Sequence, residues 1–301
     1  MRIDAHNHPN WYGYNFDRFI ENMDANQIDK TCIISWETPE SEHIIGQTWI
    51  VSDYLTTGGP PVPAPFSQCI DFKVRAPDRF ILGYGPDPRN PKAIDLLHSA
   101  ILNFDAKICG EIKYRMMYDN PDAIDLFRYA GEQGLPVVLH FDYPEATKQS
   151  YIYPRRNWWY GGDIDTLERV LKLCPNTNFL GHAPGFWCHI SNDDAGRTVS
   201  KPKGPVTRGG KIEQFLDKYP NLYCDCSAKS AVNALSRDVE YSKGLILAHP
   251  DRFVFARDNF ENELIRLIDC MDLPEKIRES FYNDNILRLM HMDQNTQKQS
   301  G

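Results

Sequence analysis

Two histidines, His6 and His8, stand at the end of the first apolar segment of the chain, residues 2–6. In a β-strand, side chains two residues apart project from the same face, so both imidazoles face one side. Two neutral imidazoles that converge at a strand end can hold a divalent metal ion. A histidine pair can equally be solvated or structural, and the other strand ends must decide between these interpretations.

Five further polar side chains occupy comparable positions later in the chain. Glu111 and Lys113 lie two residues apart in the fourth apolar segment, His140 and His182 end the fifth and sixth, and Asp258 follows the eighth. Four of the nine histidines thus fall at strand ends, which chance does not readily explain. Imidazoles and carboxylates are metal ligands, and a carboxylate can also act as a general base. The pattern therefore indicates metal-assisted chemistry.

Eight short apolar segments alternate with amphipathic stretches from one end of the chain to the other. The predicted strands are residues 2–6, 30–36, 80–84, 106–114, 136–141, 177–182, 221–227 and 252–257. Helical spacing of apolar residues predicts helices over residues 15–26, 91–104, 121–133, 164–173 and 211–219. Pro274 is expected to split the long final pattern, residues 261–290. Eight such units predict an α/β fold, a distorted (β/α)8 TIM barrel, whose functional side chains project from the C-terminal strand ends.

Two connections in this barrel are long. Residues 37–67 follow the second strand and residues 183–210 follow the sixth, so both are expected at the mouth of the barrel as lids or substrate walls. A single barrel domain is expected over residues 1–291. The polar residues 292–301 predict a disordered tail.

The composition argues against several classes of protein. The 301 residues are 42% hydrophobic and 25% charged, which is typical of a soluble globular protein. A net charge of -8 without a basic stripe argues against nucleic-acid binding, and no apolar run is long enough to span a bilayer. Eight scattered cysteines without a CxxC pair favour buried free thiols in a cytoplasmic protein. The first strand begins so early that no signal peptide is expected.

The set of strand-end residues resembles the hallmark of the amidohydrolase superfamily of metal-dependent hydrolases. That hallmark is HxH after strand one, Lys or Glu on strand four, His after strands five and six, and Asp after strand eight. The segment 283–289 also resembles the closing helix of the amidohydrolase-related branch, which contains hydrolases, lactonases and non-oxidative decarboxylases. The resemblance covers essentially the whole chain.

The resemblance implies a role for each matching residue. His6, His8 and His140 would ligate a divalent metal, most often zinc in this superfamily. Asp258 would ligate the metal or hydrogen-bond its water, and would act as the general base. His182 would bind a second metal or polarise the substrate, so one or two ions are implied. Bound Zn²⁺ lowers the pKa of its water to roughly 7, which suits hydrolysis at neutral pH.

The fourth strand leaves its alternatives open. Glu111 resembles the glutamate that bridges two metals in some branches, and Lys113 resembles the lysine, sometimes carbamylated, that does so in others. In mononuclear members neither residue binds metal, and Lys113 could contact an anionic substrate instead. An ion pair between the two residues is the structural alternative. Asp4 also has two possible roles. It orients the imidazoles through their second nitrogen, or it is a purely structural residue.

Candidate substrate-binding residues are Lys113, Arg115, Trp158 and Trp187, because cations suit carboxylates and aromatic rings suit planar substrates. Loop packing is the alternative for each. The main functional hypothesis is a hydrolase that cleaves a C–O or C–N bond of a small molecule. A non-oxidative decarboxylase of an unsaturated or aromatic acid is the second, and the Gly-Glu-Ile motif shared with TatD-type nucleases suggests a third. A non-catalytic barrel that binds a ligand is the remaining alternative, and a homo-oligomer is compatible with each.

Overall fold

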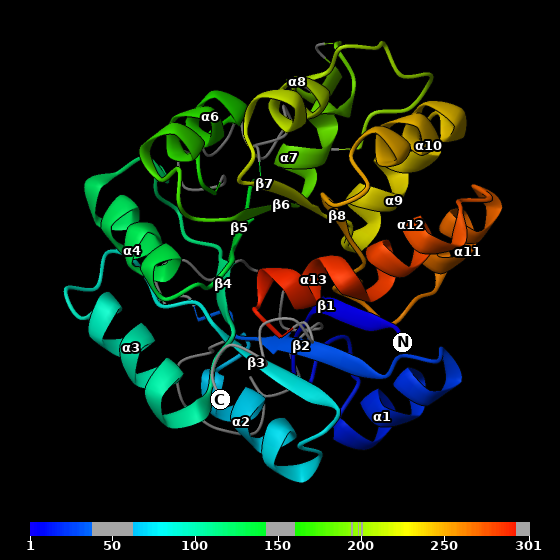
Figure 1. The fold of residues 1–301 in the computed structure, drawn as a ribbon. Helices are drawn as coiled ribbons and strands as arrows, with labels where there is room; N and C mark the ends of the chain where they lie inside the picture. The colour runs from blue at the N-terminus through cyan, green and yellow to red at the C-terminus, as the bar shows by residue number, and fades with distance from the viewer. Residues whose placement is uncertain (38–62, 143–159, 194, 198, 200, 293–301) are drawn as a thin grey trace, which may run out of the picture.

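A computed structural model describes residues 1–37, 63–142, 160–193, 195–197, 199 and 201–292. Eight parallel strands follow one another around a single sheet in sequence order, with helices on the outside (Figure 1). The strands are β1 (Ile3–Asn7), β2 (Lys30–Ile34), β3 (Phe80–Tyr84), β4 (Ile108–Ile112), β5 (Val137–His140), β6 (Phe179–His182), β7 (Leu222–Asp225) and β8 (Phe253–Val254). The predicted TIM barrel and all eight of its strands are confirmed.

The helices alternate with these strands. They are α1 (Phe16–Ala25), α2 (Phe66–Arg75), α3 (Ala93–Phe104), α4 (Pro121–Glu132), α6 (Ile164–Leu173), α8 (Lys211–Lys218), α9 (Ala228–Ser236), α10 (Val239–Ala248) and α11 (Glu263–Cys270). The five helices predicted from spacing are present, whereas α2, α9 and α10 were not predicted. Pro274 separates α11 from a last helical segment made of α12 (Glu275–Glu279), η7 (Ser280–Asp284) and α13 (Asn285–Leu289), as expected.

Parts of the predicted connections can be followed. Residues 38–62 of the first connection and the predicted tail beyond 292 lie outside the described residues, and the single-domain assignment stays a prediction. The second connection carries the short helices α7 (Pro184–Trp187), η5 (Cys188–Ile190) and η6 (Ala195–Arg197). In the described part of the chain, none of the helices combines the length and apolar character needed to cross a bilayer.

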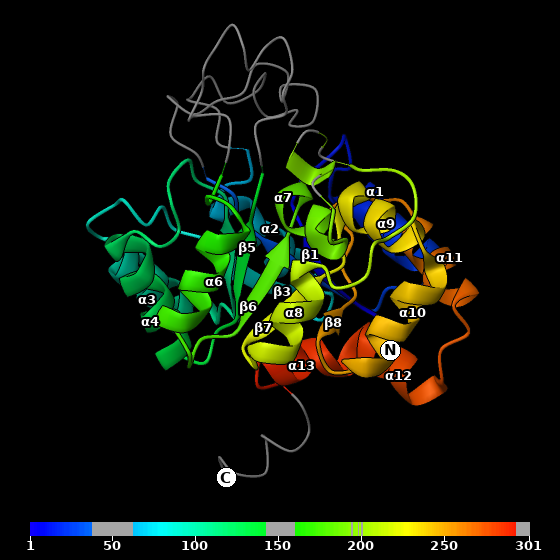
Figure 2. The same ribbon diagram turned by 90° about the horizontal axis from the view of Figure 1, so that it is seen from above.

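Two layers of apolar side chains position the strands. The inner layer fills the barrel and includes Ile3, Ala5, Val138 and Leu180, while the outer layer packs the strands against the helices. Helix α13 adds Ile286, Leu289 and Met290 to the inner layer. It lies across the end of the barrel where the strands begin (Figures 1 and 2). The opposite end, where the strands terminate, is therefore the end that can hold a site.

Backbone hydrogen bonds between the first strand and the segment after β8 bring the barrel to closure. Ala5 N–H donates to the carbonyl of Phe255 (3.0 Å), and Asp258 N–H donates to the carbonyl of His6 (2.8 Å). The second bond joins two predicted metal ligands, His6 near the start of the chain and Asp258 after β8. The contacts that close the barrel therefore also bring these two residues together.

A buried ion pair reinforces this seam on its outer side. Arg257 Nε donates to Asp4 Oδ2 (2.9 Å), and the Arg257 backbone N–H donates to Asp4 Oδ1 (2.8 Å). Arg257 also donates to the Asn22 side chain on α1 (2.7 Å). Both charged side chains are buried. The Asp4 carboxylate therefore links β1 to the segment after β8, and Arg257 extends this link to α1, which is the structural role of the two considered for Asp4.

Replacement of Arg257 by Met should strongly destabilise the fold, because it leaves the Asp4 carboxylate buried without its cation. The expected loss is about 3–5 kcal/mol in the free energy of unfolding, measured by denaturant titration. The control is Arg278→Met, which breaks an exposed pair with Glu275 and should cost less than about 1 kcal/mol. Adding Asp4→Asn to Arg257→Met should recover part of the lost stability. Equal losses of stability for Arg257→Met and for the control Arg278→Met would contradict this role.

Candidate metal centre and active-site pocket

Seven buried or nearly buried polar side chains form one cluster at the C-terminal ends of the strands. We call it the strand-end cluster, and its members are His6, His8, Glu111, His140, His182, Asp225 and Asp258. Six were predicted as metal ligands from the sequence and lie together as expected. Asp225, the last residue of β7, was missed.

A β-bulge in β1 turns His6, and His8 directly after the strand, into the barrel. Ile3 and Ala5 face the inner layer and Asp4 faces α1, so strict alternation would aim His6 outward. The pairing of β1 with β2 shifts by one residue between Asp4 and Asn7. The extra residue reverses the alternation, which is how bulges re-aim side chains. The imidazole rings of His6 and His8 then lie 5.2 Å apart, at the barrel interior.

The fourth strand uses the same device for Glu111. Ile108 belongs to the inner layer and Cys109 to the outer layer, so alternation would again point residue 111 outward. The pairing of β4 with β5 shifts by one residue between Cys109 and Ile112. Glu111 therefore faces the cluster and Ile112 takes the outer side. β5 and β6 keep their regular register, and His140 and His182 pair directly across it.

Hydrogen bonds through Nδ1 fix the orientation of all four imidazoles in the cluster. His8 Nδ1–H donates to the carbonyl of Ile34 (2.8 Å), and His182 Nδ1 shares a hydrogen bond with Ser227 Oγ (2.8 Å). Their Nε2 atoms then face Glu111, at 3.3 Å from Oε2 and 3.4 Å from Oε1 respectively. An imidazole held through one nitrogen offers the other as a ligand.

His6 is oriented by the acid that the sequence analysis missed. Its Nδ1–H donates to Asp225 Oδ2 (2.6 Å), and the other oxygen of Asp225 accepts the backbone N–H of Ser227 (2.9 Å). Trp187 donates from its indole to the backbone carbonyl of Asp225 (2.9 Å). Asp225 is thus held from two sides and in turn holds His6. The signal in the sequence was its place at the end of the seventh strand.

Glu111 lies at the centre of the cluster. Oε1 accepts from His140 Nδ1 (2.6 Å), while Oε2 faces His8, so its two oxygens point to different imidazoles. The Lys113 ammonium packs 3.9 Å above the Trp36 ring, and none of the carboxylates in the described residues comes within 4.0 Å of it. Burial alone would raise the pKa of Glu111, but Lys113 and His140 hold this pKa well below its ordinary value.

The charges of the cluster favour a cation in it. Burial opposes the charge of His6, but Asp225 outweighs it and raises the pKa of His6 to about 9. Burial lowers the pKa of His182 well below its usual value, so this ring is neutral and its lone pair is available. Burial also raises the pKa of Asp258, with the charge of Glu111 adding to the effect. A proton or a metal ion is therefore preferred between these acids.

The donor set fits a divalent metal ion. Three overlapping groups each bring one donor atom per residue within 4.8 Å of one another: His6, His182 and Asp225; His6, His8 and Glu111; and Glu111, His140 and His182. Among the described residues, His6 Nε2, His140 Nε2 and Asp258 Oδ1 are buried and have no hydrogen-bond partner, and unpaired buried atoms of this kind are costly. Mixed imidazole and carboxylate donors suit ions such as Zn²⁺ and Mn²⁺.

A pocket of about 480 Å³ opens onto the cluster. His140, His182 and Asp258 line its depth, and the aromatic residues Tyr12, Tyr14 and Phe260 line its side. The rings of Tyr14 and Phe260 stack at 3.7 Å. A volume of this size accommodates a small organic molecule with an aromatic or apolar body.

Backbone strain concentrates in the same pocket. Tyr12, Ala183, Ala228 and Asp258 all have positive φ angles, between 50° and 75°, and all four line the pocket. Residues other than glycine rarely adopt this conformation, and they cluster at functional sites where the surrounding structure enforces it. At Asp258 the strained residue is itself a member of the strand-end cluster.

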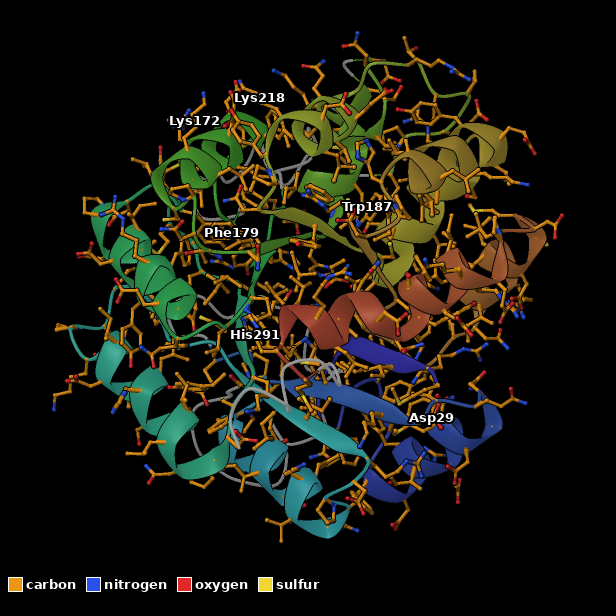
Figure 3. The ribbon with its side chains drawn as sticks, viewed as in Figure 1. Asp29, Lys172, Phe179, Trp187, Lys218 and His291 are labelled. Atoms are coloured by element: carbon orange, nitrogen blue, oxygen red, sulfur yellow. The ribbon has the colours of Figure 1, made fainter. Side chains whose placement is uncertain are left out.

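The residues predicted to bind substrate are distributed differently. Lys113 lies at the cluster, and Arg115 packs on the Tyr160 ring at 5.5 Å, one aromatic ring away from His140. Trp187, on α7 (Figure 3), is 1% exposed, donates from its indole to the backbone carbonyl of Asp225, and is not among the described residues that line the pocket. Trp158 lies outside the described residues.

Solved structures with the same fold include several decarboxylases, some of them with bound manganese. The chain is similar to 2,6-dihydroxybenzoate decarboxylase from Rhizobium (14% identity, TM-score 0.58, 97% of this chain and 99% of that one). It is similar to dihydroxybenzoic acid decarboxylase from Polaromonas sp. JS666 with bound manganese and the inhibitor 2-nitroresorcinol (15% identity, TM-score 0.55, 93% of this chain and 87% of that one). It is also similar to a proposed amidohydrolase from Staphylococcus aureus (14% identity, TM-score 0.61, 96% of this chain and 99% of that one).

Searches with protein-family models and among curated proteins find no match. At these identities the likeness to the solved structures is one of fold. It supports the barrel fold that the sequence predicted and shows nothing finer. The chemistry must be argued from the cluster and its pocket.

Binding of a divalent metal should release about one proton per ion near pH 7, because His6, with a pKa of about 9, is protonated until the ion replaces the proton. The measurement is isothermal titration calorimetry in two buffers of different ionisation enthalpy. Affinity should rise up to about tenfold per pH unit and level off above about pH 9. A His6→Asn variant should lose this release, and absence of proton release from the unsubstituted protein would contradict the assignment.

Asp225→Asn should weaken metal binding about 10- to 100-fold, because it removes the charge that orients His6. The measurement is the metal dissociation constant, obtained by competition with a chromogenic chelator. Asp95→Asn, an exposed substitution on α3, is the matched control and should bind metal as the unsubstituted protein does. Unchanged affinity in the Asp225 variant would show that Asp225 is only a structural partner.

Proposed function

We propose that this chain is a divalent-metal-dependent enzyme of the amidohydrolase superfamily that removes the carboxyl group of an aromatic or unsaturated acid. The observation that carries the proposal is the pocket, which joins His140, His182 and Asp258 to the aromatic side formed by Tyr12, Tyr14 and Phe260. A planar acid suits such a pocket, since its ring packs on aromatic side chains while its carboxylate reaches the cationic centre.

The solved structures with this fold support decarboxylation over the hydrolysis that the sequence favoured. Two of the three described above are decarboxylases of dihydroxybenzoic acids, and one of them holds manganese. The third, a proposed amidohydrolase, keeps hydrolysis of a lactone, ester or amide as the competing function. Both reactions would use the same cluster, so the assay must separate them.

The cluster residues would hold the metal, and Asp258 would handle the proton. A bound divalent ion supplies Lewis acidity toward an oxygen of the substrate. Asp258 lines the pocket beside His140 and His182, so its carboxyl group lies where it can carry a proton to a bound substrate. As the bond to the carboxylate breaks, its electron pair stays on the substrate carbon, carbon dioxide leaves, and Asp258 gives its proton to that carbon. Solvent then returns the proton to Asp258.

Metal identity and count belong to the same proposal. The donor set suits either Zn²⁺, as expected from the sequence, or Mn²⁺, as held by the Polaromonas decarboxylase. Glu111 presents its two oxygens to different imidazoles, so it could bridge two ions or bind one. Elemental mass spectrometry of protein purified without chelators identifies and counts the metal. The proposed substrate is a small molecule, and no nucleic acid or membrane is proposed as a partner.

The metal-loaded protein should release carbon dioxide from 2,6-dihydroxybenzoate, 5-carboxyvanillate or a related hydroxybenzoate, and should leave lactones, esters and amides intact. The measurements are carbon dioxide release and product chromatography. Asp258→Asn should lower kcat by about 10²- to 10⁴-fold, because it removes the group that transfers the proton. Asp95→Asn is again the matched control and should retain full activity.

The outcomes separate the two functions. Hydrolysis without release of carbon dioxide would establish the hydrolase instead. An active Asp258→Asn variant would exclude the proton-transfer role of that residue. Inactivity of metal-loaded protein on both substrate panels would reject both functions for those substrates.

A further inference from the structure

The wall of the pocket that follows β7 is made by the start of a helix. Ala228, Lys229 and Ser230 are the first three residues of α9, and all three line the pocket. The first N–H groups of a helix have no acceptor within the helix, and together they attract negative charge. The first of these groups, Ala228 N–H, donates to the carbonyl of Arg257 (2.8 Å). The N–H groups of Lys229 and Ser230 are therefore the donors that this end of the pocket offers, and they belong to no part of the strand-end cluster.

The residue that would normally cap this helix is engaged elsewhere. Ser227 precedes α9, yet among the described residues its side chain makes no capping hydrogen bond. Its hydroxyl instead shares a hydrogen bond with His182 Nδ1 (2.8 Å). A serine in this position commonly accepts from the second or third N–H group of the helix. Here those donors stay available to a ligand in the pocket.

Ser230 provides an independent sign of a missing partner. Its side chain is 3% exposed, lines the pocket, and its Oγ has no hydrogen-bond partner among the described residues. A buried hydroxyl without a partner disfavours the folded state, whereas an alanine in its place would not. A hydroxyl retained at such a place is explained by a ligand that accepts its hydrogen bond.

The charge at the rim of the pocket is consistent with an anion. Lys201 is exposed and lines the pocket, while Lys229 is paired with Glu261 at 3.2 Å. Among Lys201, Lys229 and Glu261, the positive charge of Lys201 is therefore the one that no carboxylate of the three balances. Its ammonium would attract an anion from solvent, and the donors of α9 would bind that anion by hydrogen bonds.

We propose that the start of α9, with Ser230 Oγ and Lys201, binds a second oxyanion of the substrate, separate from the group that reacts at the strand-end cluster. This inference rests on the proposed function and narrows its substrate to an acid with two anionic groups. The second group is a carboxylate or a phosphate, since both accept several hydrogen bonds from donors of this kind. Loops after the seventh strand of such barrels commonly bind phosphate groups.

The test compares probes with one and two anionic groups on metal-loaded protein. Isothermal titration calorimetry gives dissociation constants for benzoate, isophthalate, terephthalate and 3-phosphonobenzoate at constant ionic strength. At least one doubly anionic probe should bind about tenfold or more tightly than benzoate. The carboxylate and phosphonate arms then tell which oxyanion the subsite prefers.

Ser230→Ala should remove most of that preference, about tenfold, and leave benzoate binding unchanged. Ser236→Ala is the matched control, because Ser236 is an exposed serine at the far end of the same helix. The Ser230 variant should unfold at the same or a higher temperature than the unsubstituted protein, since it removes an unpaired buried hydroxyl. If Ser230 had only a structural role, the variant would instead unfold at a lower temperature or change the binding of all probes equally.

Two results would overturn the subsite. One is that none of the doubly anionic probes binds more tightly than benzoate, and the other is an equal loss for every probe in Ser230→Ala. Because binding requires no turnover, these outcomes are independent of the decarboxylation assay. If the protein prefers doubly anionic probes but releases no carbon dioxide, the subsite stands and the proposed reaction is rejected. If it releases carbon dioxide but shows no such preference, the reaction stands and the subsite is rejected.

Discussion

Three carboxylates buried among four imidazoles form the constraint on which the rest of the structure depends. Glu111 and Asp225 are buried and Asp258 is mostly buried at the mouth of the barrel, so water solvates little of their charge. Without a metal, a proton on His6 and the ammonium of Lys113 provide the compensating charge. A divalent ion supplies that charge at the atoms that lack partners. The acids are therefore better explained by metal binding than by stability.

Local irregularities in two strands make this concentration of ligands achievable. A regular strand that begins with an inward residue at position 3 would aim Asn7, not the histidines, into the barrel. The bulges in β1 and β4 shift the alternation just before His6 and Glu111. Before each bulge the strand points apolar residues into the barrel, and after it the strand points the candidate ligands into the barrel. One extra residue thus separates the part of the strand that packs the core from the part that carries the ligands.

The sequence revealed the architecture more fully than the site. Alternating apolar and amphipathic segments sufficed for the eight strands, because burial sets both periods. The strand-end histidines could be recognised from their positions, but the bulges that aim them leave no evident pattern in one sequence. Asp225 was missed because it sits between Cys224 and Cys226 in what resembles a buried strand. Trp187 looked like a loop aromatic, but α7 turns its ring into the core.

The short segment from Asp225 to Ser230 connects the two halves of the proposed site. Asp225 and Ser227 direct their side chains toward His6 and His182, so they orient the metal centre. Because Ser227 serves an imidazole, it does not cap α9, and the helix start remains open to the pocket. Three residues later, the Ser230 hydroxyl faces the same space without a partner. Under the two proposals, recognition of the substrate and orientation of the metal ligands both depend on this short segment, whose backbone is also strained at Ala228.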